Sequence, residues 1–153
     1  MSDIDSRGIV VPCGSCGQKN RLPFDRLTAK TQCGKCGARL DAPGEPIEVP
    51  DAAAFDAMIA RSSLPIVVDF WAPWCGPCRM VAPEMSRVAA RNRGRYVIVK
   101  VNTDAVPDLG DRFGIRSIPT MAVFAGGGER GRTAGARPAA EIETFIQSTL
   151  AGR

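Results

Sequence analysis

The stretch FWAPWCGPCRM at residues 70–80 holds two cysteines separated by two residues, and it overlaps the apolar run PIVVDFWA at 65–72. That run has the length and the continuous apolar character of a central strand covered on both faces. Pro77 lacks a backbone N–H, which costs nothing in the first turn of a helix. Apolar residues then recur at helical spacing behind it. The stretch therefore predicts a strand that leads into a helix, with Cys75 at the helix N-terminus.

Strands and helices alternate on both sides of this stretch. The patterns predict a short strand at 47–49, a helix capped by Asp51, a strand at 96–102, a short helix at 106–113, strands at 120–125 and 130–134 joined across glycines 126–128, and a last helix at 138–150. This order is typical of a three-layer α/β domain, with a central mixed sheet flanked by helices.

The stretch DAPGEP at 41–46 has the proline, glycine and acidic residues of a linker. It divides the chain into residues 1–40, a linker at 41–46 and an α/β domain at 47–153. The first part has four cysteines and few large apolar residues. A segment of about 40 residues with so little to bury rarely folds without a metal or disulfides, so we expect the metal to serve as its core.

Composition excludes several classes of function. The net charge of +4 is spread over both parts of the chain with no basic run, so a nucleic-acid partner is not expected. The polar start lacks a secretory signal, and no apolar run reaches the roughly 18 residues of a membrane span. We therefore expect a cytoplasmic protein without a membrane partner. In a reducing compartment six cysteines favour metal binding or redox catalysis over structural disulfides.

Four of the cysteines have the spacing of a metal site. Cys13, Cys16, Cys33 and Cys36 form two Cys-x2-Cys pairs separated by 16 residues. Gly17 and Gly37 follow the pairs and permit the positive φ of a metal knuckle. Because the chain has no histidine, any metal must be bound by sulfur or carboxylate. The pattern predicts one structural zinc in a closed four-thiolate ribbon, with iron, two disulfides or free thiols as alternatives.

The pair at 75–78 differs from these two. Pro77 cannot donate an N–H to a sulfur, so the knuckle turn loses a donor. A helix N-terminus instead favours a thiolate at Cys75. Lowering the thiol pKa by about 1.5 units requires roughly 2 kcal/mol, and a well-placed helix end contributes up to ~2 kcal/mol. The third pair is therefore predicted to be redox-active.

These motifs resemble the thioredoxin family. WCGPC follows an apolar strand with an internal aspartate, and GIRSIPT stands downstream at 114–120. The resemblance covers residues 47–153, and the added four-cysteine segment is similar to the zinc-containing second type of bacterial thioredoxin. It implies a thioredoxin fold preceded by a small zinc ribbon.

The resemblance also implies catalytic roles. Cys75 matches the nucleophile of a redox-active disulfide and Cys78 the resolving thiol. Asp69 matches the buried aspartate that helps to deprotonate the resolving thiol, Lys100 a lysine near it, and Pro119 a cis-proline facing the cysteines. Independently, a carboxylate inside IVVDFW should be desolvated and have a raised pKa. The alternative is an aspartate and a lysine exposed to solvent at strand ends.

A client-docking surface is implied beside the cysteine pair. Trp74, Ile118 and Gly135 match residues that frame this apolar surface in the family. The cis-proline would leave the backbone of Ile118 free to pair with an extended client. Phe113 and Ser117 depart from the family's usual residues, so client preference stays open.

The implied function is a protein-disulfide reductase that maintains cell redox homeostasis. An NADPH-dependent flavoprotein, thioredoxin reductase, would recycle it, and disulfide-containing proteins would be its clients. The chain has no nucleotide-binding glycine motif, so we expect no tightly bound organic cofactor, and we expect a monomer. The alternatives are an oxidase or isomerase of an oxidising compartment, a nucleic-acid adaptor, and a redox-sensing holdase that releases zinc.

Overall fold

A computed structural model describes residues 2–152, and in it a five-stranded mixed sheet forms the centre of the larger domain. The strands lie in the order β10-β9-β7-β8-β6, with β6, β8 and β7 parallel and β9 and β10 antiparallel to their neighbours. The elements are β6 (Ile47–Glu48), α1 (Ala52–Arg61), β7 (Ile66–Trp71), α2 (Gly76–Arg91), β8 (Val97–Asn102), α3 (Pro107–Arg112), β9 (Thr120–Ala125), β10 (Gly128–Ala134) and α4 (Ala139–Ala151). The predicted α/β architecture is confirmed.

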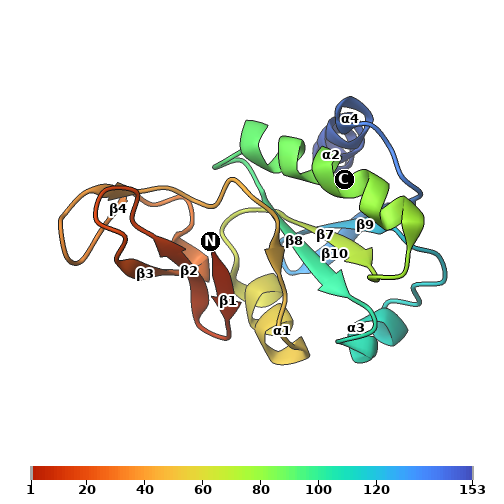
Figure 1. The fold of residues 1–153 in the computed structure, drawn as a ribbon, viewed down its shortest axis with the longest axis horizontal. Helices are drawn as coiled ribbons and strands as arrows, with labels where there is room; N and C mark the ends of the chain where they lie inside the picture. The colour runs from red at the N-terminus through yellow and green to blue at the C-terminus, as the bar shows by residue number, and fades with distance from the viewer. Residues whose placement is uncertain (1, 153) are drawn as a thin grey trace.

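Helices cover both faces of this sheet. Figure 1 shows α2 and α4 on one face and α1 and α3 on the other. Alternate residues of β7 pack against the two helix layers, because successive side chains of a strand point to opposite faces of the sheet. Val67 packs in the cluster that includes Val81 of α2, whereas Val68 and Phe70 pack in the cluster that includes Phe55 of α1. Both faces of the central strand are therefore buried, as its apolar run predicts.

The predicted hairpin near the C-terminus differs slightly from the structure. The second strand, β10, begins at Gly128, two residues earlier than predicted. Its pairing with β9 is irregular between Glu129 and Gly131. Gly126 and Gly127 form the turn, and both have positive φ. The third glycine of the run therefore belongs to the strand, because two glycines suffice for the turn.

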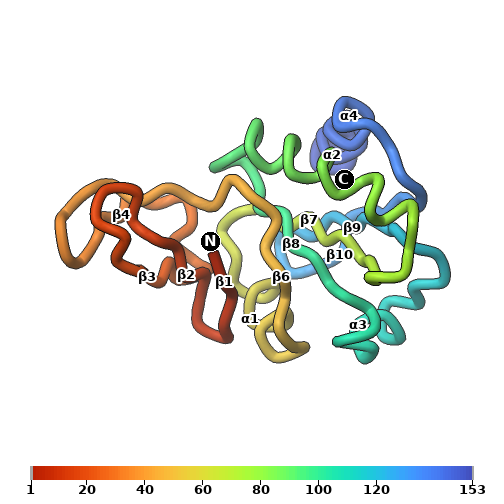
Figure 2. Tube along the Cα trace, viewed as in Figure 1, coloured from red at the N-terminus to blue at the C-terminus, as the bar shows by residue number. Residues whose placement is uncertain are grey.

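The amino-terminal segment, residues 2–40, is built from short strands, and we call it the ribbon (Figure 2). It has a three-stranded antiparallel sheet, a single 3-10 turn and a two-stranded sheet. These elements are β1 (Asp3–Asp5), β2 (Gly8–Pro12), β3 (Lys19–Pro23), η1 (Phe24–Arg26), β4 (Thr31–Gln32) and β5 (Arg39–Leu40). Each Cys-x2-Cys pair lies in the turn between two strands, β2–β3 and β4–β5.

The ribbon packs directly on the larger domain. Ile9 and Phe24 are 0% and 1% exposed, and they belong to the same apolar cluster as Phe55 of α1. The backbone N–H of Ser63 donates to the carbonyl oxygen of Phe24 at 2.9 Å, and the N–H of Leu27 donates to Oγ of Ser63 at 3.0 Å. The ribbon has few large apolar side chains, as expected, and these are buried in an apolar cluster that it shares with the larger domain.

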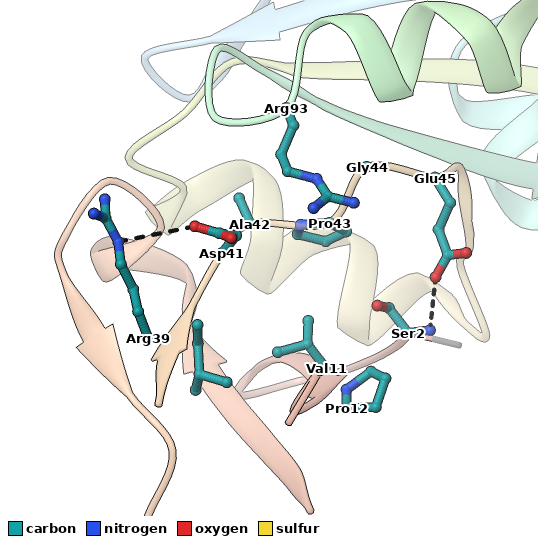
Figure 3. A pocket seen from close by; sticks show the side chains of 12 residues that line it. Ser2, Val11, Pro12, Arg39, Asp41, Ala42, Pro43, Gly44, Glu45 and Arg93 are labelled. Atoms are coloured by element: carbon teal, nitrogen blue, oxygen red, sulfur yellow. Dashed lines mark hydrogen bonds and ion pairs between the residues drawn. The ribbon is translucent and has the colours of Figure 1, made fainter. Parts of the chain in front are cut away.

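The ribbon and the start of α2 lie at opposite ends of the molecule (Figure 1). Two hollows of about 340 and 400 Å³ lie where the ribbon meets the linker. Figure 3 shows the first, with Arg93 at its upper edge and the Arg39–Asp41 contact at its side. Neither hollow is lined by a cysteine. Within residues 2–152, no helix has the length and apolar character needed to cross a bilayer.

Candidate active site and metal centre

Cys75 and Cys78 form a disulfide at the N-terminus of α2, at the carboxyl end of the central strand β7. Cys75 is the helix N-cap, and the backbone N–H of Cys78 donates to its Sγ at 3.2 Å. This contact uses one of the N–H groups that a helix leaves unpaired in its first turn. In the reduced protein the same donor and the helix dipole would stabilise a thiolate at Cys75.

The loop before β9 closes one side of the pair. The Ile118–Pro119 peptide bond is cis, and the carbonyl oxygen of Ile118 lies 3.6 Å from Sγ of Cys75. The N–H of Gly135 donates to the carbonyl oxygen of Pro119 at 2.8 Å, and Gly135 has φ of +97°. A residue with a Cβ rarely adopts this φ. The two loops beside Cys75 are thus bonded to each other.

Two large apolar side chains near Cys75 are open to solvent. Trp74 is 68% exposed and Met80 is 72% exposed, whereas Cys75 itself is 4% exposed. A hollow of about 200 Å³ lies beside Trp74 and is also lined by Ile118, and another of about 300 Å³ lies beside Met80. Exposed apolar residues around a concave surface are typical of a protein-docking site.

Asp69 lies on β7 and is fully buried. Neither of its carboxylate oxygens has a hydrogen-bond partner among the described residues. Burial raises the pKa of Asp69 to about 7, the positive charge of Lys100 opposes this shift, and the negative charge of Glu48 adds to it. The carboxyl can therefore hold or release a proton near neutral pH.

Lys100 is the register partner of Asp69 on the adjacent strand β8. Its Nζ lies 4.3 Å from the centroid of the Trp71 ring, where the ammonium is attracted by the π face. The indole N–H of Trp71 donates to Oε1 of Glu48 at 3.0 Å. Asp69 and Lys100 thus lie side by side, as the resemblance implies, and Glu48 joins them.

The four ribbon cysteines meet at one point. Their sulfur atoms all lie within 4.8 Å of one another, and the pairs Cys13–Cys36 and Cys16–Cys33 are each 3.6 Å apart. A tetrahedral zinc with bonds of about 2.3 Å would place its sulfurs about 3.8 Å apart. The donor set and its spacing therefore fit a metal bound by four thiolates.

Backbone donors favour the thiolate at two of the ribbon cysteines, Cys13 and Cys33, by lowering the pKa of each. The backbone N–H of Gln18 also lowers the pKa of Cys16, but burial and the neighbouring ribbon thiols raise it overall to about 12. Gly17 and Gly37 both have φ of 78°, so the backbone reverses direction after each Cys-x2-Cys pair. The backbone N–H of Cys36, the side-chain amide of Asn20 and the backbone N–H of Lys35 lower the pKa of Cys33 to about 6. Because metals bind the deprotonated sulfur, these donors prepare the site for a cation.

A family model described as "Thioredoxin" matches residues 46–148, the part of the chain that carries the helix-capping disulfide. The chain belongs to the thioredoxin family. Thioredoxins are thiol-disulfide oxidoreductases, and the Cys75–Cys78 disulfide fits their active-site motif, so this chain has that activity. A zinc-ribbon model described as "Thioredoxin 2, N-terminal" matches residues 12–38, which carry all four ribbon cysteines.

Some curated relatives are similar to this thioredoxin over nearly the whole chain, and others over the α/β domain alone. Thioredoxin C-3 of Corynebacterium nephridii is 39% identical over 143 residues, which are 93% of this chain and 96% of the relative. Thioredoxin 1 of Chlorobaculum tepidum is 48% identical over 99 residues, which are 65% of this chain and 98% of the relative. The second alignment is about the length of the α/β domain alone.

Solved structures match the same domain. A mutant thioredoxin from Halobacterium salinarum superposes with a TM-score of 0.65 at 26% identity, covering 72% of this chain and 95% of its own. Plasmodium falciparum thioredoxin gives a TM-score of 0.61 at 30% identity, covering 66% and 96%. The ribbon is thus an addition to a thioredoxin domain of ordinary extent.

No sequence pattern indicated Glu48 as part of the site. The alternation of Ile47, Glu48 and Val49 signals an edge strand with one outward polar residue, and nothing in it indicates a partner. Only the register of β6 against β8 places Glu48 beside Lys100. A polar residue in a strand gives no information about which strand will be its neighbour.

Proposed function

We propose that this thioredoxin is a protein-disulfide reductase, and the observation that carries the proposal is Cys75 capping α2 between exposed Trp74 and Met80. In the reduced protein the Cys75 thiolate attacks one sulfur of a client disulfide. A bond forms between Cys75 and that sulfur, the client S–S bond breaks, and the other client sulfur leaves as a thiolate that takes a proton from water. Trp74, Ile118 and Gly135 frame the surface on which the client docks.

Cys78 then resolves the mixed disulfide. Its thiol gives a proton to the Asp69 carboxylate, and the resulting thiolate attacks the sulfur of Cys75. The Cys75–client bond breaks, the Cys75–Cys78 bond forms, and the second client sulfur leaves as a thiolate that is protonated. The client has gained two electrons and two protons, which the protein dithiol has lost. Lys100 moderates the charge on Asp69, and Pro119 holds the facing loop in place.

The oxidised pair must then be reduced again. We infer that an NADPH-dependent thioredoxin reductase supplies the two electrons, and that the protein works as a monomer in the cytoplasm for cell redox homeostasis. This chain's own contribution is its pair of thiols, so it needs no bound organic cofactor. The reducing compartment keeps the four ribbon thiols available for metal.

The ribbon is proposed to hold one structural zinc through Cys13, Cys16, Cys33 and Cys36. Zinc would supply the cross-link that holds the two turns together, and it would leave no open position for a substrate. The matching ribbon family is a zinc ribbon, which favours zinc over iron. We propose residues 1–40, 41–46 and 47–153 as ribbon, linker and thioredoxin domain, with Met1 and Arg153 outside the described residues.

The test is turnover of a model protein disulfide by the full chain with NADPH and a thioredoxin reductase. Cys75→Ser should abolish it, because serine cannot form the mixed disulfide. Cys78→Ser should accumulate the mixed disulfide with a client, seen as a mass increase that a reductant reverses. Undiminished turnover by Cys75→Ser would refute the mechanism.

A further inference from the structure

Glu48, Lys100 and Asp69 form a charged row across three neighbouring strands. Glu48 on β6 and Asp69 on β7 are both register partners of Lys100 on β8. Register partners on adjacent strands point to the same face of a sheet, so the three side chains share one face. The row runs from the buried centre of the sheet to its exposed edge, because Asp69 is fully buried and Glu48 is exposed.

The two carboxylates share a single cation. Lys100 forms no ion pair within 4.0 Å with Glu48 or Asp69 among the described contacts, and its Nζ lies over the ring of Trp71. The same indole donates its N–H to Glu48. Trp71 therefore holds the carboxylate at its edge and the ammonium over its face. Moving either charge would change the field at Asp69.

Within residues 2–152, no other charged group enters this row. The layer of α2 over this face presents buried Cys78 and Val81. On β9, the register partner of Asp69 is the uncharged Met121. The charged side chains of α2 are engaged elsewhere: Arg79 donates to the carbonyl oxygen of Pro73, Glu84 pairs with Arg87, and Arg91 pairs with Glu143. Lys100 and Glu48 are the charges that act on Asp69.

We propose that Glu48 is a positioning residue of the resolving step, which shares the Lys100 ammonium with Asp69 and so sets how readily Asp69 takes the proton of Cys78. This inference rests on the role of Asp69 proposed above. Glu48 attracts the ammonium toward the sheet edge, which leaves Asp69 less stabilised as a carboxylate and therefore a stronger base.

The direct test follows the side-chain carboxyl of Asp69 in the oxidised full chain by ¹³C NMR against pH. Glu48→Gln should lower the titration midpoint of Asp69 by about 0.5 pH unit, because the ammonium then acts on Asp69 alone. Lys100→Gln should raise the midpoint, and Glu48→Asp, which keeps the charge, should hold it near the wild-type value. The pH profile of mixed-disulfide resolution should move in the same direction as the midpoint.

Glu129→Gln is the matched control, because Glu129 lies on β10 at the opposite edge of the same sheet. It should leave both the midpoint and the profile unchanged. An unchanged or raised midpoint in Glu48→Gln, with folded variants verified by circular dichroism, overturns the inference. Asp69→Asn separates the two proposals: if it removes the pH dependence of resolution while Glu48→Gln shifts nothing, the role of Asp69 stands and the role of Glu48 fails.

Discussion

The chain contains three Cys-x2-Cys pairs, and the two in the ribbon differ from the one in the thioredoxin domain in a single backbone donor. In the ribbon, the N–H two residues after the first cysteine donates to its sulfur: Ser15 to Cys13 and Lys35 to Cys33, each at 3.4 Å. In the third pair that position is Pro77, which has no N–H. Cys75 still accepts from the N–H of the next residue, the second cysteine of the pair, as Cys13 and Cys33 also do.

This difference separates two uses of the same spacing. After each ribbon pair a glycine with positive φ reverses the chain, so the four sulfurs converge from two turns. After Pro77 the chain continues as a helix, and the two sulfurs form a disulfide with each other instead of joining a four-sulfur cluster. The Cys-x2-Cys spacing allows two sulfurs to approach one another. The backbone that follows determines whether they join two more sulfurs at a metal site or form a redox-active pair.

The largest expected effect is that mutating the third pair removes turnover but not zinc, whereas mutating a ribbon pair removes zinc but not turnover. Cys75→Ala should lower turnover with NADPH and a reductase by at least about a thousandfold while one zinc per chain remains bound, because the nucleophile is lost and the ribbon is untouched. Cys13→Ala should lose the zinc and keep most of the turnover, because the ribbon lies at the opposite end of the molecule. Elemental analysis and the coupled assay measure the two outcomes.

Two outcomes would contradict this division between a metal site and a redox pair. Zinc that persists at one equivalent in Cys13→Ala would contradict the four-thiolate site. Zinc that is lost in Cys75→Ala would mean that the third pair shares the metal. Cys36→Ala repeats the ribbon test at a ligand that lies toward the surface, where truncation leaves no internal cavity.

The second prediction concerns the buried carboxyl on the strand that leads to the third pair. The pKa of Asp69 is raised from 3.8 to about 7, so between about pH 4 and 7 the folded protein keeps a proton that the unfolded chain releases. The free energy of unfolding therefore falls as pH rises through this window. Asp69→Asn should remove the fall and stabilise the protein at pH 8 by up to about 4 kcal/mol.

Urea unfolding at several pH values measures this effect. Asp3→Asn, at an exposed carboxylate of β1, is the matched control and should keep the wild-type pH dependence. A wild-type profile in Asp69→Asn would mean that the buried carboxyl is already ionised at acidic pH.

The third prediction tests how far the two regions are independent. Phe24 of the ribbon is buried in the cluster that also holds Phe55, so Phe24→Ala should lower the free energy of unfolding of the whole chain by about 3 kcal/mol. It should also speed hydrogen exchange in α1 while zinc and cysteine chemistry persist. Phe145→Ala, on the far face of the sheet, should leave exchange in the ribbon unchanged. Separate unfolding transitions for the ribbon and the thioredoxin domain in the wild-type protein would show that the shared core does not couple their unfolding.

The smallest expected effect comes from converting one motif into the other. Pro77→Ser changes CGPC at 75–78 into CGSC, the same four residues as at 13–16. The new N–H should lower the pKa of Cys75 slightly and change turnover by less than about tenfold, because the helix end still supplies the main field. Thiolate absorbance against pH measures the pKa. A second bound zinc would show that the donor alone, without two further sulfurs, makes a metal site.

Much of this protein was predictable from local patterns. The apolar run of β7, the capping residue Asp51 and the proline of the third pair each act within a few residues of chain, so they predict strands, helix starts and the position of Cys75 correctly. The four-cysteine spacing likewise depends only on two turns. The sequence by itself therefore determined the α/β order, the redox pair and the sulfur set of the ribbon.

Tertiary structure alone decided which distant residues meet. The placement of Glu48 beside Lys100 depends on the register of two strands about fifty residues apart, and the burial of Phe24 depends on where α1 lies. Strand pairing and packing are fixed by the summed burial of many side chains, not by any one segment. Hence the chemistry of the cysteines could be predicted from local sequence. The electrostatic partners of Asp69 and the core shared by the ribbon and the thioredoxin domain could be identified only in the folded chain.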